Sequence, residues 1–150
     1  MRTRRGLIGP LLMVFGAWLL LRDRLEAVEV RGRSMAPTLL AGDRLLLVRL
    51  ASPPRAGDVV VAPDPRDGDR ELIKRVAGVD AFGVTLRGDN PAFSTDARTF
   101  GTIDPGTVRW RAVFRYWPRG RIGPIPPAPE ELAEAGGESS CALPDALLGH

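Results

Sequence analysis

The chain has 150 residues, 44% of them hydrophobic, and a formal net charge of +3, which suits one domain with a core of its own. Its basic residues are 20 scattered arginines and one lysine, Lys74, so we expect no nucleic-acid partner. The only histidine is the terminal His150 and the only cysteine is Cys141, which excludes a zinc site and disfavours a histidine-dependent triad. We expect no cofactor and no metal. A nucleophilic enzyme would need Lys74 as its base, because arginine stays protonated, although a GC-rich genome could also leave a single lysine by chance.

The N-terminal part of the chain is typical of a membrane anchor. Residues 7–21 form an uninterrupted apolar run with arginines on both sides. As a helix this run would be roughly 23 Å long, slightly short of a ~30 Å hydrocarbon core, and flanking arginines can make up the difference. A cleavable signal peptide has the same first two regions. Because residues 22–26 offer no pair of small residues for cleavage, we expect residues 1–24 to be an uncleaved transmembrane anchor with a cytoplasmic basic end.

Residues 25–118 read as strands separated by turns rich in proline and glycine. Alternating or short apolar runs predict strands at residues 26–33, 44–50, 59–62, 71–78, 84–87 and 108–116. No helical period is convincing in this part, so the fold class is mainly β, a compact antiparallel domain behind one N-terminal transmembrane helix. Residues 119–150 are rich in proline and glycine, which predicts a loosely ordered, removable tail with at most a short helix near residues 129–135.

Three segments carry residues suited to catalysis. They are Arg-Gly-Arg-Ser-Met-Ala-Pro-Thr-Leu at 31–39, Glu-Leu-Ile-Lys-Arg-Val-Ala-Gly at 71–78, and Gly-Asp-Asn-Pro-Ala-Phe-Ser-Thr-Asp-Ala-Arg-Thr-Phe-Gly at 88–101. Each alone is ordinary, since serine and Gly-Asp-Asn are common turn residues. In this order, with a membrane anchor before them and a β domain around them, the three segments resemble the type I signal peptidase family of Ser/Lys endopeptidases. The resemblance runs from about residue 28 to residue 116.

The resemblance implies a role for each matching residue. Ser34 would be the nucleophile, Lys74 the general base, and Ser94 the hydroxyl that holds the lysine amine in line. Asp96 and Arg98 would form an ion pair that braces the third segment. The family's chemistry is hydrolysis of a peptide bond through an acyl-enzyme.

The strand pattern supports the lysine assignment independently. In a strand, Lys74 shares a face with Leu72 and Val76. Burial of an amine among apolar neighbours disfavours its charged form, which makes a lysine a usable base near neutral pH. The alternative is that Lys74 is a surface residue of an amphipathic strand.

The resemblance also implies the substrate. Met35 would pack beside the nucleophile, and apolar, shallow subsites would select small residues, so we expect cleavage after Ala-x-Ala in precursor proteins with signal or leader peptides. The partners would be these precursors and the lipid bilayer, with the catalytic domain on the outer face of the plasma membrane. Gly32 departs from relatives that carry a hydroxyl residue two positions before the nucleophile. The Ser34 backbone N–H is one candidate oxyanion donor, and the second donor is unidentified.

Three alternatives remain open. The short chain is also similar in size to mitochondrial inner-membrane peptidases and to dedicated maturation proteases of the nickel superoxide dismutase processing type, which would act on one precursor. A self-cleaving regulator of the LexA type uses the same dyad but has a DNA-binding domain ahead of it. The third alternative is an inactive, membrane-tethered binding domain.

Overall fold

A computed structural model describes residues 8–94 and 101–128. One helix, α1 (Ile8–Arg22), precedes a β domain. The strands are β1 (Leu25–Glu29), β2 (Arg44–Arg49), β3 (Val59–Asp64), β4 (Asp67–Asp80), β5 (Gly83–Arg87), β6 (Trp110–Trp117) and β7 (Gly123–Pro124). Short 3-10 helices occupy Pro91–Phe93, Pro105–Thr107 and Arg119–Arg121.

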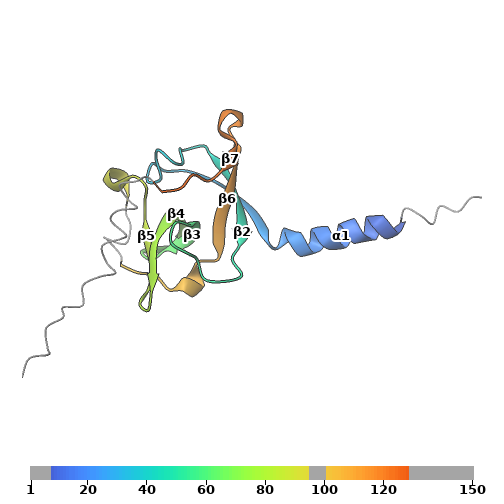
Figure 1. The fold of residues 1–150 in the computed structure, drawn as a ribbon, viewed down its shortest axis with the longest axis horizontal. Coiled ribbons are helices and arrows are strands. Elements are labelled where there is room, and N and C mark those ends of the chain that lie inside the picture. Colours follow the sequence, from blue (N-terminus) through green and yellow to red (C-terminus); the bar gives the residue numbers. More distant parts are fainter. Residues whose placement is uncertain (1–7, 95–100, 129–150) are drawn as a thin grey trace, which may run out of the picture.

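The strands form one antiparallel sheet in the order β1-β2-β6-β3-β4-β5, and β7 pairs with residues 114–115 of β6, beyond the residues of β6 that pair with β3 (Figure 1). The expected fold class, mainly β and antiparallel, is therefore confirmed. The sheet brings β6 between β2 and β3, although it follows them by more than 40 residues. This pairing places residues from the end of the domain next to the segment between β1 and β2.

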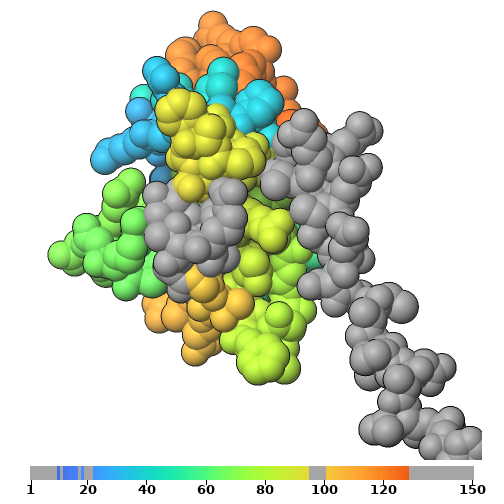
Figure 2. Space-filling model, turned by 90° about the vertical axis from the view of Figure 1, so that its left-hand side faces the viewer, coloured from blue at the N-terminus to red at the C-terminus, as the bar shows by residue number. Residues whose placement is uncertain are grey.

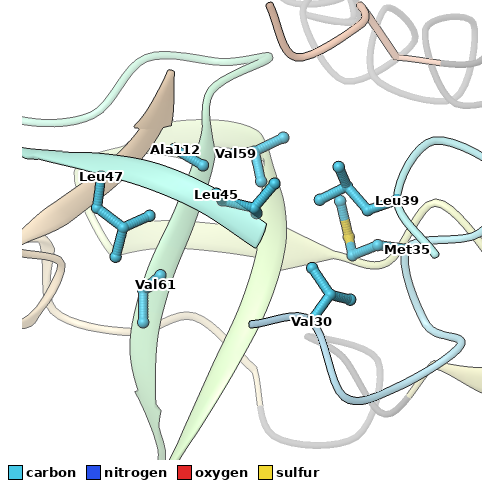
Figure 3. Packing of buried hydrophobic residues seen from close by; sticks show 8 residues of the cluster. All are labelled: Val30, Met35, Leu39, Leu45, Leu47, Val59, Val61 and Ala112. Atoms are coloured by element: carbon cyan, nitrogen blue, oxygen red, sulfur yellow. The ribbon is translucent and has the colours of Figure 1, made fainter. Parts of the chain in front are cut away.

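Alternating apolar residues of the strands build two buried clusters, because successive side chains of a strand point to opposite faces. The first cluster joins three strands, β2, β3 and β6, to the segment after β1, and consists of Val30, Met35, Leu39, Leu45, Leu47, Val59, Val61 and Ala112 (Figure 3). Met35 and Leu39 enter it from outside the sheet. The buried side chains of Met35 and Leu39 thus attach the turn between β1 and β2 to the core, and burial of their apolar surface stabilises this attachment.

Two segments are more ordered than their composition suggests. The polar stretch before the lysine strand is a tight hairpin, with Asp64 paired to Asp67, so β4 begins four residues before the expected strand. The expected loose tail from Arg119 is packed on the domain through residue 126, because Gly123 and Pro124 pair with β6, Ile125 packs against the first cluster and the Pro126 carbonyl accepts a hydrogen bond from Arg75. The remainder of that tail, residues 129–150, including Cys141 and the expected short helix, lies outside the described residues.

The apolar N-terminal run is helical, as expected, and α1 projects from the β domain (Figure 1). Its 15 residues include several exposed apolar side chains, among them Phe15 and Trp18. Among the residues that the structure describes, no helix is both long and apolar enough to cross a membrane.

Candidate active site

Ser34 lies at the start of a turn that leaves the core after β1. Its neighbour Met35 is 1% exposed, whereas Ser34 itself is half-buried. Within the turn, the Leu39 N–H donates to the Met35 carbonyl at 2.8 Å, and Val30 and Gly42 close the base of the loop through a backbone hydrogen bond of 2.9 Å. The buried side chains of Met35 and Leu39 thus hold the turn in place and leave the Ser34 side chain at its edge.

Lys74 lies in the middle of β4, opposite Val60 of β3. It is only 2% exposed and shares its face with the buried Leu72 and Val76, as the alternation predicts. Its Nζ donates a hydrogen bond to the Oγ of Ser94 at 2.8 Å. The structure therefore places a lysine amine in an apolar surrounding and joins it to the expected hydroxyl.

Gly88 is the point at which the serine turn and the Ser94 segment meet. A Cβ built on Gly88 would overlap the Ser94 Oγ and lie 2.5 Å from the Ser34 carbonyl oxygen. That carbonyl accepts a hydrogen bond from the Asn90 N–H at 2.9 Å. Figure 2 shows the blue and cyan segment that contains the turn beside the yellow segment that ends at residue 94. Only a residue without a side chain fits between the two, so Gly88 allows their close approach.

A buried ion pair lies on the opposite face of β4, directly after the lysine. Arg75 donates to both carboxylate oxygens of Asp89, at 2.9 and 2.7 Å, and the two side chains are 5% and 0% exposed. Arg75 also donates to the Gly57 carbonyl at 2.9 Å. This bidentate pair ties β4 to the loop that carries Gly88. Both residues lie within the segments suited to catalysis, but the sequence predicts no role for either, because an Asp after Gly is typical of a turn.

A groove of about 970 Å³ runs past Ser34. One border is residues 27–35, from β1 to the serine turn, and the other is residues 67–73 of β4, with Val61 between them. Among the strand pairs that the structure describes, β1 pairs along one edge, with β2, and residues 67–73 of β4 pair along one edge, with β3. The groove is thus lined by the other edges of these two strands, which pair with no strand that the structure describes.

The hairpin that forms one end of the groove is held by a local ion pair. Arg66 donates two hydrogen bonds to the Asp64 carboxylate, at 2.9 and 2.8 Å, and the Arg66 N–H donates a third at 3.1 Å. The side-chain bonds from Arg66 hold the pKa of Asp64 below its ordinary value, against the opposing effect of burial. The ion pair accounts for the order of a hairpin that has few apolar residues.

Two of the expected site residues, Asp96 and Arg98, lie outside the described residues, so their pairing stays a prediction. Gly32 is exposed, and a Cβ there would lie 4.0 Å from the Ser34 backbone nitrogen. Gly32, where some relatives carry a hydroxyl, is therefore close to the Ser34 backbone N–H, the candidate oxyanion donor.

The chain is similar to known proteins of one family. A family profile described as "Signal peptidase, peptidase S26" matches residues 4–87. The mitochondrial ATP-independent inner membrane protease subunit 1b of Arabidopsis thaliana is 30% identical over 124 residues, which is 65% of this chain and 73% of the relative. The mitochondrial inner membrane protease subunit 1 of Schizosaccharomyces pombe is 33% identical over 110 residues, covering 58% and 70%. Signal peptidase I of Leptolyngbya laminosa is 26% identical over 152 residues, covering 69% and 74%.

The matched residues include the serine turn and the lysine strand. The chain belongs to the signal peptidase family, peptidase S26. It is a serine peptidase of the type I signal peptidase kind.

Proposed function

We propose that this chain is a membrane-anchored endopeptidase that removes signal or leader peptides from exported proteins with a Ser34–Lys74 dyad. The observation that carries the proposal is the buried Lys74 amine bonded to Ser94, whose hydroxyl meets the Ser34 segment at Gly88. A buried base bonded to an orienting hydroxyl, together with a serine that lines a groove, supports nucleophilic catalysis.

The proposed reaction begins with neutral Lys74. Its lone pair takes the proton of the Ser34 hydroxyl as Oγ attacks the substrate carbonyl carbon. The tetrahedral intermediate collapses, the C–N bond breaks, and the leaving amine receives the proton from Lys74. A water then gives its proton to Lys74 and attacks the resulting ester, which releases the acid product and returns the proton to Ser34. The Ser34 backbone N–H is our candidate donor to the oxyanion.

The substrate is proposed to bind in the groove as an added strand. The second edges of β1 and of residues 67–73 can each offer backbone N–H and carbonyl groups to an extended peptide. An extended segment that passes Ser34 would present alternate side chains to the wall formed by Met35, Val61 and Leu72. A shallow apolar wall rejects bulk by clash, which supports the preference for Ala-x-Ala.

Helix α1 is proposed to attach the enzyme to the plasma membrane, with the catalytic domain on the outer face. Its exposed apolar side chains, such as Met13 and Trp18, fit a helix inserted in a bilayer, and the guanidinium of Arg22, which lies 5.9 Å from the Trp18 ring centre, fits the end of such a helix at the bilayer surface. Retention in the membrane fraction after carbonate washing, with the C-terminus protected from protease added to the cytoplasmic side, is expected. A protein released by carbonate would contradict this attachment.

The proposal is tested by cleavage of a precursor with an Ala-x-Ala site by wild type and by Ser34→Ala. Cleavage in trans by wild type alone is expected. Cleavage of only the chain itself would favour a LexA-type regulator, and equal absence of cleavage by both proteins, across a peptide library, would favour an inactive binding domain. Cleavage of one natural precursor, with generic Ala-x-Ala peptides ignored, would identify a dedicated maturation protease.

A further inference from the structure

The segment that follows β6 contacts both parts of the proposed active site. It comprises residues 119–126, which we call the C-terminal brace. The brace begins with the 3-10 helix Arg119–Arg121 and continues through β7. In Figure 2 this orange segment lies beside the cyan part of the serine turn.

Arg121 of the brace is bonded to the serine turn. Its NH1 group donates to both carboxylate oxygens of Asp43, at 3.0 and 3.1 Å, and its NH2 group donates to the Thr38 carbonyl at 3.2 Å and the Pro37 carbonyl at 3.5 Å. Arg115 of β6 donates to the same Thr38 carbonyl at 3.0 Å and to Asp43 at 3.4 Å. Two guanidinium groups thus bind one carboxylate and the carbonyls of the turn that begins at Ser34.

Asp43 forms hydrogen bonds with residues before and after the serine, at both ends of the turn. It is 2% exposed, and its carboxylate also accepts the Leu40 N–H at 3.0 Å. Its backbone carbonyl accepts the Val30 N–H at 2.8 Å, at the point where the chain leaves β1. Because charge-assisted bonds in a buried site are strong and directional, they fix the backbone of the turn more tightly than its apolar contacts alone.

The brace also contacts the lysine strand. The Pro126 carbonyl accepts a hydrogen bond from Arg75 at 3.2 Å, and Ile125 packs against the cluster that contains Met35. Arg75 is adjacent to Lys74 and is paired with Asp89. The brace therefore touches the turn of one proposed catalytic residue and the strand of the other.

We propose that Arg121 is a positioning residue, which holds the serine turn so that Ser34 is in reach of the Lys74 amine. The inference rests on the proposed function. Loss of Arg121 leaves the groove and the lysine site in place but lets the turn shift. A shift of about 1 Å is enough to reduce turnover about a hundredfold when reacting groups must be aligned.

The test compares Arg121→Met with Arg119→Met, an exposed arginine of the same 3-10 helix. Both proteins are assayed with the same Ala-x-Ala peptide, at a temperature well below the unfolding midpoint of each. Arg121→Met is expected to lower kcat at least about tenfold with KM within about twofold, and Arg119→Met to match wild type. Arg121→Lys should recover part of the lost kcat, because an ammonium supplies charge without the planar fork.

Wild-type kcat in folded Arg121→Met would overturn the inference, as would a loss confined to KM or an equal loss in Arg119→Met. If Arg121→Met does not fold, Arg121→Lys carries the test, and an unchanged kcat in that variant overturns it. Ser34→Ala is measured in parallel. Activity in Ser34→Ala would refute the dyad itself, whereas inactive Ser34→Ala with fully active Arg121→Met would refute only the role of Arg121.

Discussion

The Lys74 Nζ donates to the Ser94 Oγ over 2.8 Å, from the middle of β4 to a residue 20 positions later. A neutral amine that donates one N–H to a fixed hydroxyl has its lone pair directed elsewhere. In the proposed mechanism that lone pair accepts the proton of Ser34.

The rate of cleavage should depend on pH through the amine of Lys74. Lys74 is 2% exposed, and burial disfavours the charged form of an amine, whereas only the neutral form can accept the proton of Ser34. The kcat/KM value should rise with pH and level off once the amine is neutral, which a pH–rate profile measures. A rate that still climbs near pH 10 would show that burial does not tune the amine.

Gly88→Ala should disable the site without a change at any proposed catalytic residue. The added Cβ would overlap the Ser94 Oγ and press on the Ser34 carbonyl oxygen, so it separates the two segments. We expect kcat to fall at least about tenfold. Gly78→Ala, in the neighbouring strand β4 and with no atom within 4 Å of the new Cβ, is the matched control and should keep its activity. Equal activity of the two variants would contradict the close approach.

Asp89→Ala should strongly destabilise the domain. It leaves the guanidinium of Arg75 buried without its carboxylate, and loss of one member of a buried pair costs ~3–5 kcal/mol. Chemical denaturation measures the free energy of unfolding. Glu29→Ala removes the exposed pair with Arg44 and should cost less than ~1 kcal/mol. A similar small loss in both variants would show that the Arg75–Asp89 pair adds little.

The hairpin ion pair should make stability depend on acid pH. The pKa of Asp64 is below its ordinary value of 3.8, so the stabilisation by Arg66 is present above that value and is lost as pH falls through the lowered pKa. Arg66→Gln should therefore lower the unfolding midpoint at neutral pH and differ less from wild type in strong acid. Arg70→Gln, which removes only a weaker charge effect on Asp64, should have a smaller effect. A pH-independent difference for Arg66→Gln would contradict the assignment.

Much of the fold could be predicted from local patterns, because alternation marks strands directly. The burial of Leu72, Lys74 and Val76 on one face follows from their spacing. The burial of Arg75 on the opposite face does not follow from spacing, because it depends on an ion pair with Asp89, which lies in the loop after β5. Long-range pairs of this kind leave no periodic signal.

Composition predicted the C-terminal boundary poorly. Proline and glycine are typical of a loose tail, and removal from Arg119 was expected to be harmless. In the structure, Arg121 bonds to Asp43, a residue 78 positions earlier that the sequence presents as part of an ordinary Gly-Asp turn. A truncation that spares the β domain should therefore keep every residue through Pro126.

The most direct test of the account is a double-mutant cycle on Ser34 and Lys74. The kcat for one Ala-x-Ala peptide is measured for wild type, Ser34→Ala, Lys74→Arg and the double variant. If the two residues act as one unit, each single variant loses several orders of magnitude, and the double variant is no slower than either. Lys74→Arg keeps the charge but cannot release its proton, so appreciable turnover by that variant, or losses that add in the double variant, would contradict the dyad.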